Sequence, residues 1–529
     1  MDRRKFLISS LASSALLASS ALLASPGKST AAFAEAFEQD SSATGELPPA
    51  LREKLKNDPF RPQFHLLPRA NWMNDPCAPR FHNGVYHMFF QYNPHAAVWG
   101  DMHWNHATSP DLIHWKHQPI ALAPTPGSYD AYGCFTGSVL PGMDVPTILY
   151  TGVTKVTPDL ETIPGEDIRE VQCLATSTDP DLRVWKKLDK PILPLPPPGL
   201  NVSGFRDPCP WKDGDIWYLG IGSGIKKTGG AVLLYKSTDG RNWEYLHPLA
   251  QGKWNGGTMT NPVDTGEMWE CPDFFPLGEK HVLLYSTERK VYWQAGTFDK
   301  SDLKFHAETT GMLDHGYYYA MKSMLDEKGR RILWGWVEES RTAEQCLAAG
   351  WAGSMALPRV LTLGPDNQLR MDVPPEFASL RKKTVTIKGG HEAPKLNAEL
   401  AKTAIQNRAG EIVCKFKPDA APCALELRTA PDNSPFFTIQ YEGSSTKPTV
   451  KIGEKILALS PDREGVSTIH LWLDGSVIEV FLDSKEAMTA RDFTPTPSDI
   501  HIAWSGASEA LNSITVSAVQ PISPDRLTS

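Results

Sequence analysis

Three acidic residues of this chain stand at nearly the same distance from three segments of similar sequence. Asp75, Asp207 and Glu270 lie 10, 9 and 11 residues before segments that begin VYHMFF, IWYLG and HVLLY. A single Asp before a proline often does no more than form a turn, because its side chain bonds the nearby backbone. An acid at the matched position of three segments, beside an arginine in one and a tryptophan in another, is better explained by chemistry.

Carboxyl groups brought together in this way are able to cleave a glycosidic bond. One protonates the leaving oxygen, and another attacks the anomeric carbon or activates water. The two tasks need different pKa values. Arg206 adjoins Asp207 and is expected to keep that carboxylate charged, which suits it to binding sugar hydroxyls. Glu270 lies between a tryptophan and a cysteine, a less polar setting that favours a protonated acid, and Asp75 is then the natural nucleophile.

A repeated strand pattern indicates how the acids could be brought together. Five similar strand-like segments, whose starts are 62, 69, 65 and 50 residues apart, begin at Val85, Thr147, Ile216, His281 and Arg331. A Ser/Thr-Asp turn leading to an aromatic residue follows four of them, ending at Trp115, Trp185, Trp243 and Phe305. Repeats of this length built from short strands predict a β-propeller, here with five blades. If the acids lie on the inner strands of blades one, three and four, they meet at one end of the central channel.

The composition is that of a globular chain without a strongly charged face. The 529 residues are 41% hydrophobic and 22% charged, with a formal net charge of -8. No block of Lys and Arg stands out, so a nucleic-acid partner is not expected. The eight cysteines form no CxxC pair, which argues against a disulfide framework, although Cys414 and Cys423 could bridge if their strands pair. His103 and His106 lack a third ligand at zinc spacing, and no metal is expected.

The amino-terminal residues resemble a twin-arginine export signal. Residues 1–34 contain paired arginines at Arg3 and Arg4, followed by a weakly apolar run rich in Ala and Ser, and they end in a small-x-small cleavage site. An uncleaved membrane anchor is the alternative, but the frequent serines make this run a poor hydrocarbon span. We therefore expect an exported protein, periplasmic or extracellular, with no stable membrane anchor after cleavage.

The rest of the chain divides into a linker, a propeller, a second linker and a sandwich. The expected bounds are 35–61, 62–360, 361–385 and 386–522. Alternating strands broken by Gly, Pro and Asp predict the β-sandwich, so the fold class is all-β. We expect the sandwich to pack against the propeller rather than to bind sugar as a lectin does, with Glu479 and Asp483 solvated.

Several motifs stand in the order and spacing found in glycoside hydrolase family 32. The chain carries WMNDPCA, FFQYNP, FRDP, WECPD and, in its tail, LDGSVIEVFLDS. It resembles the invertases, inulinases, levanases and fructan exohydrolases of that family, together with their fructosyltransferase relatives. The resemblance implies a five-bladed propeller followed by a β-sandwich, and a retaining reaction through a covalent fructosyl-enzyme.

The same resemblance implies roles for individual residues. It makes Asp75 the nucleophile, Glu270 the acid/base and Asp207 the transition-state stabiliser that holds fructose hydroxyls. It implies no metal and no organic cofactor. The substrate-pocket positions of the family fall on Asn74, Gln91, Trp99, Phe135, Thr136 and Arg206.

Three departures from the common family pattern bear on the substrate. NDPNG in many members is NDPCA at Cys77 and Ala78, FSGS is FTGS at Thr136, and WGN is WGD at Asp101. The implied reaction is hydrolysis of terminal fructosyl units of sucrose or short fructans. A fructosyltransferase shares the first half-reaction and stays open as an alternative, as does a homodimer formed through the sandwich. A catalytically silent sugar-binding propeller is less expected, because all three acids are present.

Overall fold

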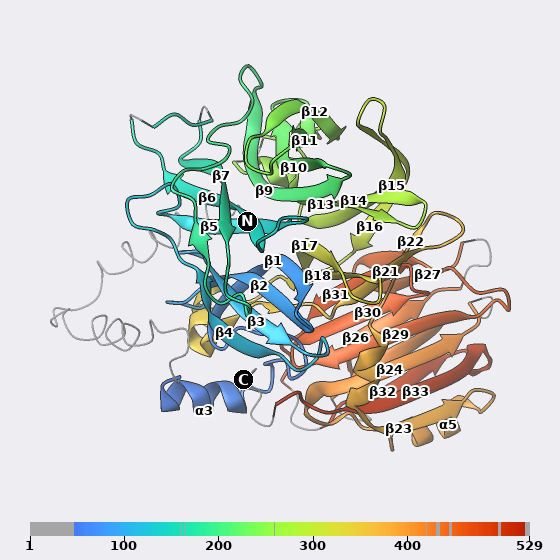
Figure 1. Ribbon diagram of the computed structural model, residues 1–529. Helices are drawn as coiled ribbons and strands as arrows, with labels where there is room; N and C mark the ends of the chain where they lie inside the picture. Colours follow the sequence, from blue (N-terminus) through green and yellow to red (C-terminus); the bar gives the residue numbers. More distant parts are fainter. Residues whose placement is uncertain are drawn as a thin grey trace.

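The computed structural model describes most of the chain beyond its amino terminus. The described residues are 47–158, 160–163, 165–258, 260–418, 421–429, 434–443, 447–495 and 499–523. The predicted export signal, residues 1–34, lies outside them, as does the first linker up to residue 46. Within the described part, no helix is long and apolar enough to span a membrane. Figure 1 shows two β-rich units, one coloured blue to yellow and the other orange to red.

Five small antiparallel sheets make up the first unit, and each is one blade of a β-propeller. Blade one contains β1 (Asn71–His82), β2 (Val85–Asn93), β3 (His103–Ser109) and β4 (Lys116–Leu122). Blade two contains β5 (Gly133–Leu140), β6 (Thr147–Lys155), β7 (Ile168–Thr176) and β8 (Lys186–Lys187). Blade three contains β9 (Val202–Asp213), β10 (Ile216–Ile225), β11 (Gly229–Ser237) and β12 (Glu244–Gln251).

The last two blades complete the ring. Blade four contains β13 (Glu270–Leu277), β14 (Lys280–Thr287), β15 (Lys290–Asp299) and β16 (Lys304–Asp314). Blade five contains β17 (Tyr318–Leu325), β18 (Arg331–Val337), β20 (Ser354–Met355), β21 (Arg359–Leu363) and β22 (Leu369–Asp372). The short strand β19 (Trp351–Ala352) follows helix α4 (Ala343–Ala349) and pairs in parallel with β1. Late residues of the propeller thus extend the sheet of its first blade.

The inner strands close on one another around the central axis. Strand β1 lies against β5 and β17, and β9 lies against β5 and β13, while β13 also contacts β17. The five-bladed propeller predicted from the repeats is therefore confirmed. The five repeated segments are β2, β6, β10, β14 and β18, the second strand of each blade. The strand before each of them is the inner one, as the position of the acids required.

Every inner strand has a β-bulge at the same level of the channel. Pairing with the second strand is interrupted between Met73 and Pro76, Phe135 and Gly137, Arg206 and Cys209, Glu270 and Asp273, and Tyr319 and Lys322. Asp207, Cys271 and Ala320 have positive φ angles of 64°, 50° and 52° at these points. A bulge bends its strand and re-aims a side chain, and such bulges are frequent next to active sites.

The second unit is a sandwich of two antiparallel sheets, as predicted. One sheet contains β23 (Arg381–Lys388), β33 (Leu511–Val519), β24 (Ala409–Phe416), β29 (Ser467–Asp474), β30 (Val477–Leu482) and β31 (Glu486–Arg491). The other contains β28 (Lys455–Ala458), β27 (Thr449–Ile452), β26 (Pro435–Tyr441), β25 (Cys423–Arg428) and β32 (His501–Gly506). Helix α5 (Ala393–Leu400) contacts β32 and β23. Cys414 and Cys423 belong to different sheets and are free thiols.

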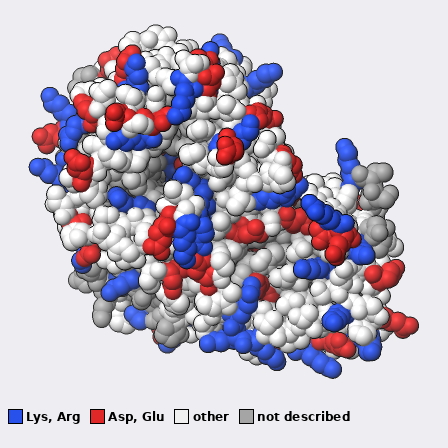
Figure 2. All heavy atoms as spheres, turned by 45° about the vertical axis from the view of Figure 1, so that its right-hand side comes forward, with Lys and Arg blue, Asp and Glu red and all other residues white. Residues whose placement is uncertain are grey.

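Both expected linkers contain regular structure. Residues 361–385 include the end of β21, strand β22 of blade five, the 3-10 helix η2 (Pro375–Leu380) and the start of β23. The described part of residues 35–61 includes helix α3 (Pro49–Asn57), whose Leu55 is fully buried in a small cluster with Trp351. On the face shown in Figure 2, basic and acidic side chains are mixed across both units.

A buried group of charges joins the propeller to the sandwich. Arg359 of β21 donates hydrogen bonds to Asp314 of β16 (2.7 Å) and to Glu479 of β30 (2.9 Å), and all three side chains have no exposed surface. The expectation that Glu479 is solvated is therefore wrong, because the strand that carries it faces the propeller. Asp483 lies in a turn and is half-buried, where it accepts hydrogen bonds from the N–H groups of Ser460 and Thr468.

The segment before blade one is held by Asp474 and Glu479 of the sandwich. Backbone N–H groups of Gln63, Phe64 and His65 donate to the carboxylate of Asp474 at 2.6, 2.8 and 3.0 Å. The ring of His65 bridges Asp474 (2.7 Å) and Glu479 (3.0 Å). Burial lowers the pKa of His65, but the hydrogen bonds to these two carboxylates outweigh burial and raise it to about 9. The imidazole is therefore charged at neutral pH.

Replacing Arg359 by methionine is expected to destabilise the protein strongly. The change removes the buried cation that Asp314 and Glu479 share, while His65 still pairs with Glu479, and breaking a buried pair in this way costs about 3–5 kcal/mol. Urea denaturation at pH 7, followed by circular dichroism, measures the loss.

Arg370→Met provides the matched control. Arg370 pairs with Asp366 at 3.1 Å, but the two side chains are 25% and 41% exposed, and exposed pairs contribute about 0–1 kcal/mol. Equal losses in the two variants would contradict the role assigned to the buried group.

Candidate active site

Asp75 lies at the bulge of β1, within reach of three neutral hydrogen-bond donors. Asn74 donates to Asp75 Oδ1 at 3.0 Å, while Thr136 Oγ1 of β5 lies 2.6 Å and Gln91 Nε2 of β2 3.5 Å from Oδ2. Gln91 also donates to Thr136, and Asn74 donates to Gln91 Oε1 at 3.0 Å. Asp75 is 8% exposed. Two strands of blade one and the inner strand of blade two thus orient it.

Asp207 lies on the inner strand of blade three and is almost fully buried. Its Oδ2 accepts a hydrogen bond from the N–H of Cys271 at 2.8 Å, and its own N–H donates to Thr151 at 2.9 Å. Burial raises the pKa of this carboxyl, Arg206 lowers it, and nearby Glu270 and Asp75 raise it, with the result at about 7. The expectation that Arg206 keeps Asp207 ordinarily acidic is therefore wrong.

Arg206 instead binds Glu270, on the inner strand of blade four. Its Nε and Nη2 atoms donate to Glu270 Oε1 at 3.1 and 2.8 Å, and its Nη1 donates to Glu170 of β7 at 2.9 Å. Tyr319 of β17 donates to the other oxygen of Glu270 at 2.7 Å. Glu270 therefore lies in a polar setting, contrary to the expectation from its sequence neighbours. Four blades meet at this one carboxyl group and its partners.

The thiol of Cys271 lies between two of the acids. Its Sγ atom is 3.5 Å from Asp75 Oδ2 and 3.4 Å from Asp207 Oδ2. Burial, followed by these two carboxylates, raises the pKa of the thiol well above its usual range, so Cys271 stays neutral. The predicted convergence of the acids is thus observed: Cys271 links Asp75 to Asp207, and it directly follows Glu270 in the chain.

A buried lysine adds positive charge behind the acids. Lys322 of β17 is 1% exposed, and its Nζ donates to the carbonyl oxygen of Pro272 at 2.8 Å. Burial lowers the pKa of Lys322, but nearby acidic groups, Asp273 and Asp207 among them, raise it above its ordinary value. The ammonium group is therefore charged, and its field partly offsets that of the carboxylates.

Aromatic residues form one side of the site. Trp99, from the connection between β2 and β3, meets Phe135 of β5 edge to face, with ring centroids 5.9 Å apart. Both are partly exposed. Trp72 donates to Asn74 Oδ1 at 2.8 Å and packs on Trp336 of blade five, with centroids 5.7 Å apart. Aromatic rings beside hydrogen-bonding groups suit the mixed polar and apolar surface of a sugar.

The structure adds residues that the sequence reasoning missed. Tyr319 lies 12 residues before the repeated segment of blade five, and Phe135, which the family resemblance had already placed in the pocket, lies 12 before that of blade two. Both therefore occupy nearly the same place as the three acids, and extending the comparison to all five blades finds them. Lys322 lies 9 residues before the segment of blade five, as Asp207 does before that of blade three, so the same comparison also finds it. Glu170 has no such signal, because it lies on β7, the third strand of its blade.

Asp207→Asn is expected to stabilise the protein in a pH-dependent way. An acid whose pKa is raised by folding is neutral in both the folded and the unfolded state at low pH, so its burial does not lower the free energy of unfolding there. As the pH rises from about 4 to about 7, ionisation favours the unfolded chain. The variant should match the wild type at pH 4 and exceed its free energy of unfolding at pH 8, by up to about 4 kcal/mol. Urea denaturation at both pH values measures the difference.

Asp239→Asn is the control with a pKa shift of the opposite sign. Backbone N–H groups of Asn242 and Arg241 lower the pKa of Asp239, so its stabilising contribution is lost only below about pH 4. Its loss should therefore destabilise the protein by nearly the same amount at pH 4 and at pH 8. A pH-independent effect of Asp207→Asn would rule out the raised pKa.

Two family models match the chain. The model for the glycosyl hydrolases family 32 N-terminal domain matches residues 65–372, and the model for the family 32 C-terminal domain matches residues 376–518. The first match ends at the last residue of β22. The family division thus coincides with the end of blade five.

Known proteins of similar sequence are sugar hydrolases by name. A sucrose-6-phosphate hydrolase from Escherichia coli is 30% identical over 479 residues, which cover 85% of this chain and 92% of that protein. A β-fructofuranosidase from Arabidopsis thaliana, an insoluble isoenzyme, is 38% identical over 367 residues, covering 62% of this chain and 59% of its own length.

Solved structures show the same architecture. A Bombyx mori family 32 β-fructofuranosidase variant in complex with sucrose superposes with a TM-score of 0.72 at 28% identity, covering 89% of this chain and 97% of that one. Fructan 1-exohydrolase IIa from Cichorium intybus superposes with a TM-score of 0.72 at 25% identity, covering 88% and 98%. With both family models matched along its two units, the chain belongs to glycosyl hydrolase family 32.

Proposed function

We propose that this glycoside hydrolase of the β-fructofuranosidase type removes terminal non-reducing β-D-fructofuranosyl units from sucrose or short fructans with retention of configuration. The observation that carries the proposal is the meeting of Asp75, Asp207 and Glu270 from three inner strands. Relatives named for sucrose or β-fructofuranoside hydrolysis, and a related structure in complex with sucrose, support this substrate class.

In the first half-reaction, a carboxylate oxygen of Asp75 attacks the anomeric carbon of the fructosyl unit. The bond from that carbon to the leaving oxygen breaks as Glu270 gives its proton to the oxygen. Asn74 and Thr136 hold the attacking carboxylate in place through their bonds to its two oxygens. The products are a fructosyl ester of Asp75 and the released aglycone, which is glucose when the substrate is sucrose.

In the second half-reaction, ionised Glu270 takes a proton from water as that water attacks the anomeric carbon. The ester bond breaks, fructose leaves and Asp75 becomes a free carboxylate again. Tyr319 suits both stages, because a phenol can donate to ionised Glu270 or accept from its protonated form. Arg206 holds the same carboxyl group from the other side and restrains its position.

The role proposed for Asp207 follows from how few hydrogen-bond donors its carboxyl group has in the empty site. Its carboxyl is buried with one backbone donor and a weak thiol donor, which explains why its pKa is raised to about 7. Sugar hydroxyls in the site supply further donors and so favour the ionised form. Asp207 is thus suited to grip the fructosyl unit, most strongly as positive charge develops on the ring.

Export is also part of the proposal. The twin-arginine-like residues 1–34 support it, and one relative is named as a cell wall isozyme from Zea mays. An enzyme in the periplasm or outside the cell meets its sugar substrate before that substrate enters the cytoplasm. Mass determination of the exported protein tests it, since cleavage after residue 34 makes Glu35 the first residue.

Asp75→Ala is expected to abolish turnover of sucrose without unfolding the protein. Loss of a nucleophile typically lowers kcat by on the order of 10⁴-fold or more. Fructose release is measured at saturating sucrose, and circular dichroism checks the fold. Asp302→Asn, an exposed carboxylate on blade four, is the control and should keep wild-type rates. Substantial activity in Asp75→Ala removes Asp75 from the nucleophile role.

Product analysis separates hydrolysis from transfer. The purified protein is given concentrated sucrose, and then inulin and levan, and the products are resolved by chromatography. Equal fructose and glucose from sucrose is the expected outcome, because water then completes each turnover. Excess glucose together with trisaccharides would instead identify a fructosyltransferase, and an inert protein would contradict both.

A further inference from the structure

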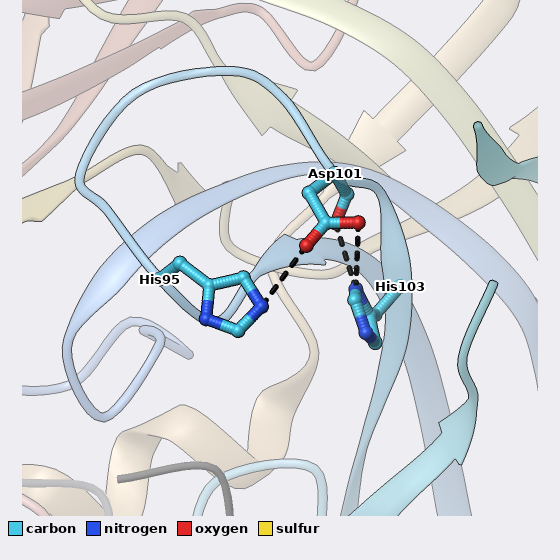
Figure 3. A group of neighbouring side chains, drawn as sticks. All are labelled: His95, Asp101 and His103. Carbon is cyan, nitrogen blue, oxygen red and sulfur yellow. Dashed lines mark hydrogen bonds and ion pairs between the residues drawn. The ribbon is translucent and has the colours of Figure 1, made fainter. Parts of the chain in front are cut away.

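A surface group on blade one combines two imidazoles with a carboxylate. His95 and Asp101 lie in the connection between β2 and β3, and His103 is the first residue of β3. Figure 3 shows both rings directed toward Asp101 from different sides. His95 Nε2 lies 2.9 Å from Asp101 Oδ2, and His103 Nδ1 lies 4.0 Å from Oδ1 of the same carboxylate. The reaction proposed above uses none of these side chains.

The spacing of these atoms fits a single metal ion. One ligand atom from each residue lies within 4.8 Å of the other two. In a tetrahedral zinc site, with bonds of about 2.0–2.2 Å, the ligand atoms stand roughly 3.4 Å apart. The observed separations of 2.9 and 4.0 Å lie on either side of that value. Small side-chain rotations are therefore enough to bring the three ligands around an ion.

We propose that His95, Asp101 and His103 bind one divalent first-row transition ion, for which Zn²⁺ is the natural probe. Two imidazole nitrogens and one carboxylate oxygen suit such an ion, whereas Ca²⁺ and Mg²⁺ prefer oxygen ligands alone. The main-chain oxygen of Asp101, 2.7 Å from His103 Nδ1, and water are at hand to complete the coordination. The ion replaces the hydrogen bonds that now link these atoms, and each neutral imidazole binds it through one nitrogen while the other nitrogen carries the proton.

Solvent reaches the group, and its backbone is already held in place. The side chains of His95 and Asp101 are 53% and 48% exposed, and that of His103 is 12% exposed. Asn93 holds the start of the connection: its amide donates to Val98 O and its oxygen accepts from the N–H of His95, both at 2.9 Å. Ligands on a restrained loop lose less conformational freedom on binding than ligands on a free one.

The far end of the connection is held as well. The carbonyl oxygen of Met102 accepts a hydrogen bond from the N–H of Cys134 of β5 at 2.8 Å. Trp99 lies between the two outer ligands in the sequence and packs against Phe135 of the same strand. A bound ion therefore ties together the two arms of the loop that presents Trp99 to the active site.

Isothermal titration calorimetry with zinc chloride tests the site on tag-free protein that has been treated with a chelator and dialysed. One saturable site per chain is expected, with binding at least about tenfold weaker in each of His95→Ala, Asp101→Asn and His103→Ala, because even changes behind the ligands cost 10–100-fold. His114→Ala is the control: its imidazole pairs with surface Asp111 at 2.7 Å but belongs to no three-ligand group within the described residues. Unchanged affinity in the three variants, or no saturable site, overturns the proposal.

Two further measurements identify the ion and its place. Calcium chloride is expected to give no saturable heat, and equal binding of Ca²⁺ would overturn the choice of a transition ion. Anomalous diffraction at the zinc edge from a soaked crystal should give a peak between the three side chains. A peak only elsewhere, for instance at the exposed group of Asp299, Asp302 and His306, would overturn the assignment. Neither measurement depends on the reaction that the enzyme catalyses.

Discussion

Mutual repulsion among buried carboxylates is the constraint around which the centre of the propeller is arranged. Arg206 divides its guanidinium between Glu170 and Glu270, and buried Lys322 adds a second positive charge from blade five. Asp207 has neither cation as a direct hydrogen-bond partner, so its carboxyl holds a proton to near neutral pH. The crowded carboxylates of the empty site thus lower the stability of the folded protein. Such a cost is common where selection acts on activity rather than on stability.

The bulges supply the geometry that this arrangement needs. Side chains along a regular strand alternate between its two faces, and each bulge interrupts that alternation at one level of the channel. Thr136, Asp207, Cys271 and Tyr319 all lie at or beside such interruptions, and each contacts a residue of another blade. Five small sheets with one shared irregularity therefore build a site that no single sheet could form.

The sequence predicted the features that repeat from blade to blade. It did not predict properties that depend on residues far away in the chain. Five similar segments revealed the second strand of every blade, and the matched acids followed from them. The pKa of Asp207 could not be read from its neighbour, because the side chain of Arg206 is directed to Glu270 and Glu170 instead. Glu479 reads as a surface strand residue until Arg359, 120 positions earlier, is brought against it. A local sequence pattern predicts local geometry. It does not predict contacts with residues that are distant in the sequence.

Asp474 has a consequence for the order in which the chain can fold. It binds the backbone at Gln63, the first part of the propeller to be synthesised, yet it follows that residue by 411 positions. Closing so long a loop is slow compared with forming a hairpin. During synthesis the segment at Gln63 therefore stays without this partner until the end of β29, which carries Asp474, has emerged from the ribosome. The sandwich thus completes a contact of the propeller that precedes it in the chain.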